Sequence, residues 1–110
     1  MVLVNKYILR ILTGEFASAI TIWPFIFVRE QRYTKDPILL NHEKIHLKQQ
    51  LETLIIFFYF IYAFDYLRNR RKGMNPRTSY FNIRFEQEAY AYEKDLNYLS
   101  NRKAYNWWRL

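Results

Sequence analysis

The sequence predicts an α+β fold in which two principal helices and a small sheet form a single domain of residues 1–110. A helix-start signal precedes apolar residues at helical spacing, a turn signal at Gly73–Pro76 separates this helix from a second one, and Ala19–Val28 is rich in β-branched and aromatic residues. A chain of 110 residues can build one modest hydrophobic core. We therefore expect one domain without internal linkers.

The N-terminal segment Met1–Leu12 is predicted to form an amphipathic helix or a strand that ends near Gly14. Lys6 and Arg10 lie inside its apolar pattern, and no small-residue cleavage site follows. This pattern does not match a secretory signal peptide. The expected location is cytoplasmic or peripheral at the inner membrane.

The segment Ala19–Val28 is predicted to be a strand. Pro24 within it has no N–H to donate to a neighbouring strand, which favours an edge strand or a bulge. An edge strand could bind an extended peptide by strand addition. A core strand with a kink is the alternative interpretation.

The first principal helix is predicted to begin at Asp36-Pro37, because aspartate is a favoured N-cap and proline is favoured at the first helical position. It could run continuously to about Arg70. The second principal helix is predicted over Ser79–Leu99.

A tail, Lys103–Leu110, follows the second helix and contains Trp107 and Trp108. These two side chains are expected either to pack on the core or to lie at a bilayer interface.

The most informative motif is His-Glu-Lys-Ile-His at positions 42–46, which contains both histidines of the chain. On a helix, His42 and His46 lie on one face, where both imidazoles can bind one zinc ion. Glu43 is placed to act as general base toward a metal-bound water. The alternative is a solvated helix face that carries two histidines by chance.

A catalytic zinc site normally has three protein ligands, and the chain has no cysteine and no third histidine. The third ligand must then be a carboxylate. The block Phe85–Tyr90, in the second predicted helix, offers Glu86 and Glu88. Two positions apart, these side chains point about 200° away from each other on a helix, so only one of them can face the histidines. A solvated acidic surface is the alternative for this pair.

Over roughly Thr21 to Tyr92, the sequence resembles the gluzincins, zinc metallopeptidases in which a glutamate from a second helix completes the site. Several membrane-linked gluzincins carry a glutamate, two variable residues, an alanine and an aspartate, and Glu86, Ala89 and Tyr90 follow that layout except that Tyr90 replaces the aspartate. The resemblance implies a minimal zincin-like domain with Glu86 as third ligand and Glu88 as the alternative. Both sequence blocks are also similar to those of small bacterial proteins without an assigned function.

The resemblance implies a zinc metallopeptidase that acts on a peptide or protein substrate. Zn²⁺ would be held by His42, His46 and Glu86, with Glu43 as catalytic base. Candidates for an oxyanion donor or for support of the metal ligands are Tyr90, Arg84 and Tyr92. The alternative function is a non-catalytic, zinc-stabilised and membrane-associated scaffold or binding module.

The net charge of +7 favours anionic partners. The apolar run Leu54–Phe64 would span about 16 Å as a helix, half of a ~30 Å hydrocarbon core, so it is expected to be a core helix or a membrane-surface helix rather than a full span. The candidates for contact with an anionic membrane surface follow it directly: Arg68, Arg70, Arg71 and Lys72. Binding to nucleic acid is not expected, because no motif for it appears.

Overall fold

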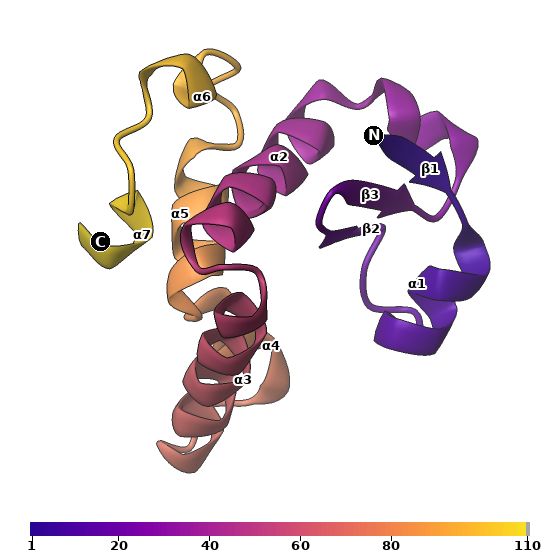
Figure 1. Ribbon diagram of the computed structural model, residues 1–110. Helices are drawn as coiled ribbons and strands as arrows, with labels where there is room; N and C mark the ends of the chain where they lie inside the picture. Colours follow the sequence, from indigo (N-terminus) through magenta and orange to yellow (C-terminus); the bar gives the residue numbers. More distant parts are fainter. Residues whose placement is uncertain (110) are drawn as a thin grey trace.

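Helix α2 (Pro37–Glu52) runs through the middle of the molecule, as shown by the computed structural model, which describes residues 1–109 (Figure 1). The sheet and α1 lie on one side of α2, and α5 with the C-terminal helices lies on the other. The remaining elements, in chain order, are β1 (Val2–Val4), α1 (Lys6–Thr13), β2 (Ala19–Ile22), β3 (Phe25–Val28), a 3-10 helix η1 (Gln31–Lys35), α3 (Ile56–Arg71), α4 (Pro76–Phe81), α5 (Arg84–Tyr92), α6 (Tyr98–Asn101) and α7 (Asn106–Arg109). The predicted α+β class is confirmed.

The segment predicted as one strand is a hairpin of two strands, so that prediction was wrong. Strands β2 and β3 are antiparallel and are joined through Trp23-Pro24, which places Pro24 in the connection. The order of the sheet is β1-β3-β2, with β1 parallel to β3. β2 is therefore an edge strand, as the first of the two alternatives expected.

The N-terminal segment contains both of the expected elements in succession, a short strand and then a helix. The side chain of Asn5 accepts hydrogen bonds from the backbone N–H groups of Tyr7 and Ile8, which starts α1. Gly14, with φ of 63°, ends the helix where predicted.

Helix α2 begins where the sequence predicted, because the Asp36 carboxylate accepts a hydrogen bond from the N–H of Leu39 and Pro37 occupies the first turn. One face of α2 packs its leucines on the sheet, against Ala19, Ile26 and Val28. The other face places Ile45 against Ala89 of α5. This packing on both faces holds α2 firmly between the sheet and α5.

The continuous helix expected from Pro37 to about Arg70 is interrupted, and that prediction was wrong. Leu54 and Ile55 adopt left-handed backbone conformations (φ 54° and 64°), and the axes of α2 and α3 differ by 111°. A left-handed conformation is unfavourable for a β-branched residue and breaks the helical hydrogen-bond ladder. The bend lets Phe58 of α3 stack on Phe85 of α5, with ring centroids 4.5 Å apart.

The second helix expected over Ser79–Leu99 consists of three shorter helices, α4, α5 and α6, so its boundaries were also wrong. Asn75 caps α4, which therefore starts earlier than expected. The chain then breaks before α5, where the Asp65 carboxylate accepts a hydrogen bond from the N–H of Arg84. This contact fixes the start of α5 against α3.

The two tryptophans of the tail differ. Trp107 is buried against Phe85, and its indole N–H donates to Glu52 at 3.0 Å. Trp108 is 71% exposed. Core packing is therefore confirmed for Trp107 alone.

Candidate metal centre

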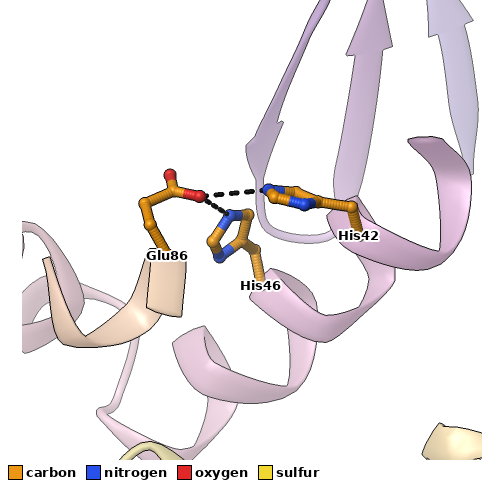
Figure 2. A group of neighbouring side chains, drawn as sticks. All are labelled: His42, His46 and Glu86. Atoms are coloured by element: carbon orange, nitrogen blue, oxygen red, sulfur yellow. Dashed lines mark hydrogen bonds and ion pairs between the residues drawn. The ribbon is translucent and has the colours of Figure 1, made fainter. Parts of the chain in front are cut away.

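Three side chains from α2 and α5 converge between the two helices (Figure 2). His42 and His46 project from the middle of α2, and Glu86 projects toward them from the first turn of α5. The Glu86 Oε1 atom lies 3.0 Å from His42 Nε2 and 3.1 Å from His46 Nε2. All three residues are buried, and their ligand atoms lie within 4.8 Å of one another, so the group could hold a metal ion.

The orientation of His46 suits a metal ligand because of its contact with Gln49. The amide nitrogen of Gln49 donates to the backbone oxygen of Phe85 and to Glu88, which turns the amide oxygen toward His46 Nδ1 at 2.7 Å. The oxygen is an acceptor, so Nδ1 of His46 must carry the proton. Loss of the proton from Nε2 on metal binding would then leave its lone pair pointing into the site, as a metal ligand requires.

A carboxylate supports the other histidine. Glu93 Oε2 lies 3.4 Å from His42 Nδ1. Glu93 follows Glu86 by seven residues, which is two helical turns, so it approaches the site from the same side. A carboxylate beside the outer nitrogen of a metal-binding histidine fixes its tautomer and raises its basicity.

The buried Glu86 carboxylate favours a positive charge beside it, either on His46 or on a bound cation. Burial alone would lower the pKa of His46, but the Glu86 carboxylate outweighs burial and raises that pKa to about 9. Burial alone would raise the pKa of Glu86, and the two histidines outweigh it and lower that pKa far below its usual range. An ionised carboxylate between two imidazoles is a suitable set of donors for a divalent cation.

Glu43 lies next to this group without belonging to it. Its Oε1 accepts a hydrogen bond from the Thr21 hydroxyl of β2 at 2.9 Å, and its Oε2 lies 3.8 Å from His42 Nε2. Burial raises the pKa of Glu43 above its usual value. The edge strand therefore positions one carboxylate oxygen and leaves the other near the atoms that could bind a metal.

A cavity of about 420 Å³ ends at these carboxylates. Its wall is mostly apolar and includes residues of α1, β2, α2, α3 and α4. The polar groups that line it include Glu43, His46 and Glu86, together with the hydroxyls of Tyr62 and Tyr80. The group that could hold a metal thus lies in the wall of a space large enough for a side chain and part of a peptide backbone.

The structure separates the two candidate third ligands. Glu88 points away from the histidines and interacts with Gln49, Tyr98 and Arg102. Its side chain is fully buried in that network. Only Glu86 joins the group that could hold a metal.

The three candidates for oxyanion donor or ligand support lie in different places. The ring of Tyr90 is 4.4 Å from the ring of His42, and its hydroxyl lies 2.9 Å from the hydroxyl of Tyr80. Arg84 forms a two-point ion pair with Asp65 outside the cavity. Tyr92 stacks on Tyr98, also outside the cavity.

Four residues of the site were not predicted from the sequence: Tyr62, Gln49, Glu93 and Thr21. Two of them could have been found from helical spacing, because Gln49 follows His42 by seven residues and Glu93 follows Glu86 by seven. Tyr62 lies in the apolar run Leu54–Phe64, and nothing in that run indicated that its hydroxyl would belong to the site. Its hydroxyl donates to Glu86 Oε2 at 2.7 Å.

Comparisons of the chain with protein-family models, with curated proteins and with solved structures found no match.

Removing the side chain of Glu93 is expected to weaken zinc binding about ten- to hundredfold, which is the usual effect of losing a partner of a metal-binding histidine. Competition with a chromophoric chelator measures this affinity in Glu93→Ala and in Glu93→Gln. Glu15→Ala, which removes an exposed carboxylate far from the site in sequence, is the control. An affinity of Glu93→Ala equal to that of the control would show that Glu93 does not support His42.

Proposed function

We propose that this protein is a zinc-dependent peptidase of the gluzincin type. The observation that carries the proposal is the convergence of His42, His46 and Glu86, with Glu43 beside them, at the end of a mostly apolar cavity. Two imidazole nitrogens and one carboxylate form a common ligand set of catalytic zinc, which leaves a position for water.

Bound zinc would polarise the scissile carbonyl and make a bound water acidic. Glu43 would accept the proton from that water through the oxygen that Thr21 does not hold, and would then donate the proton to the leaving amine. Burial raises the pKa of Glu43, which supports both halves of this proton transfer because a base that also acts as an acid needs a pKa near the working pH.

We propose Tyr62 as the donor that stabilises the developing oxyanion. Its hydroxyl lines the cavity next to Glu86. Burial, together with the neighbouring Glu86 carboxylate, raises the pKa of Tyr62 far above its usual value, so the phenol keeps its proton. To stabilise the oxyanion, the hydroxyl would turn this proton from Glu86 Oε2 toward the substrate. Among the earlier candidates, only Tyr90 remains close, through its contact with Tyr80.

The proposal is tested on the purified protein loaded with zinc. We expect about one zinc per chain by mass spectrometry, cleavage of a mixed-sequence peptide library, loss of cleavage after chelation and recovery when zinc is returned. Stoichiometric zinc without cleavage of any peptide would favour the alternative, a zinc-stabilised module without catalysis.

A further inference from the structure

Helix α3 exposes a wide apolar stripe. Tyr59 is 41% accessible to solvent, and the other five exposed large hydrophobic side chains of α3 are 55–67% accessible and lie at positions 56, 57, 60, 64 and 67. At 100° per residue these positions fall within a sector of about 100°. The opposite side of the helix carries its buried residues, Phe58, Asp65 and Asn69. The stripe is therefore the outer face of a helix whose inner face already packs on the protein.

Positive charge gathers where the stripe ends. Between Tyr66 and Phe85 the chain has six basic residues and no acidic one. Arg71 lies in line with the middle of the stripe, and Arg68 and Arg70 flank it on either side. Within residues 1–109, none of the four basic residues at positions 68 and 70–72 pairs with a carboxylate.

A polar hollow lies beside this basic end. Arg68 and Lys72 line it, together with Trp108, whose side chain is largely exposed. Tryptophan is typical of the boundary between apolar and polar layers of a bilayer, where basic side chains meet lipid phosphates. Asp65 and Asn69 of the inner face of α3 line the same hollow, so the exposed indole lies on the inner side of the basic end and the stripe on its outer side.

We propose that α3 docks on the surface of a bilayer containing anionic phospholipid, with the stripe in the acyl boundary and the basic end at the phosphates. Such a bilayer supplies an apolar layer and an anionic layer next to each other, which fits both halves of the surface. A second copy of the chain fits less well, because the net charge of +7 opposes association of like molecules. Within the described part of the chain, no single helix is long and apolar enough to cross a membrane, although the bent pair α2–α3 passes that test by length and composition.

Vesicle co-sedimentation tests this proposal without any measurement of hydrolysis. The wild type is compared on vesicles of phosphatidylcholine alone and of phosphatidylcholine with an equal part of phosphatidylglycerol. One variant, Phe60→Gln with Phe64→Gln, disrupts the stripe. A second variant replaces four basic residues by glutamine: Arg68, Arg70, Arg71 and Lys72. The control for charge replaces four exposed lysines outside α3 by glutamine: Lys35, Lys44, Lys48 and Lys94.

We expect wild type and control to bind the anionic vesicles, and each of the two α3 variants to bind about tenfold or more weakly. Added salt should weaken the binding of the wild type. Equal binding to both vesicle types would contradict the role of charge. Equal losses in the basic variant and its control would contradict the location of the surface.

Two further outcomes would overturn the proposal. Absence of vesicle binding by the wild type would do so directly. The second outcome is a wild-type dimer, seen by sedimentation, that does not bind vesicles and that dissociates in the variant Phe60→Gln with Phe64→Gln. The stripe would then be the contact between two copies of the chain. The replaced phenylalanines are exposed, and circular dichroism with zinc content confirms that each variant retains its fold.

Discussion

Replacing Glu43 by glutamine is expected to lower peptide hydrolysis about 10²- to 10⁴-fold, the usual contribution of general acid–base catalysis. Glutamine keeps the size of the side chain and can still accept the hydrogen bond from Thr21. It cannot take a proton from water. Since Glu43 is not among the three converging ligands, the variant should keep about one zinc per chain.

Single-turnover kinetics together with zinc analysis separate these two effects. Glu30→Gln is the matched control, because it makes the same chemical change at an exposed carboxylate whose partner is Arg32 rather than a residue of the site. Hydrolysis by Glu43→Gln within tenfold of this control would mean that another group activates the water. Loss of zinc in Glu43→Gln would instead make Glu43 a ligand.

The start of α2 and the pairing of His42 with His46 could be predicted from the sequence, because both depend on local rules of helix capping and helical spacing. The convergence of Glu86 with them depends on the packing of two helices. Only the resemblance of the block Phe85–Tyr90 to the gluzincin layout suggested that contact. Helical spacing alone did not decide whether Glu86 or Glu88 is the third ligand. The structure favours Glu86, because only Glu86 lies with the two histidines and Glu88 is held in its own buried network.

Two of the three breaks in the principal helices had no signal in the sequence. Neither the bend at Leu54-Ile55 nor the interruption before Arg84 contains glycine or proline, the residues that usually mark such breaks. Contacts distant in sequence produce them instead: Phe58 stacks on Phe85, and Asp65 binds the first N–H of α5. Tertiary packing here outweighs local helical preference.

The hairpin was missed for a related reason. Trp23-Pro24 is not one of the dipeptides that typically form a two-residue turn, and the flanking residues form an unbroken apolar run. Gln50 of α2 accounts for part of this turn: its side chain accepts from the N–H of Trp23 and donates to the oxygen of Thr21. A helix side chain thus occupies part of the edge at which a further strand would pair.

Replacing the third ligand is expected to have a large effect on zinc binding. The carboxylates of Glu86 and Glu88 are both buried, so replacing either one disturbs the interior. Their partners differ. Glu86 contacts both histidines, whereas Glu88 is paired with Arg102, whose side chain is only 4% exposed and also binds Glu52.

Glu86→Gln is therefore expected to reduce zinc to well below one equivalent per chain, because a neutral amide is a poor ligand for zinc. Glu88→Gln should keep its zinc and lower the free energy of unfolding by about 3 kcal/mol, since it leaves the buried Arg102 guanidinium short of a counter-charge. Zinc analysis and urea unfolding in the presence of chelator measure the two effects separately. Zinc retained in Glu86→Gln and lost in Glu88→Gln would make Glu88 the third zinc ligand. The group of His42, His46 and Glu86 between α2 and α5 would then not be the metal site.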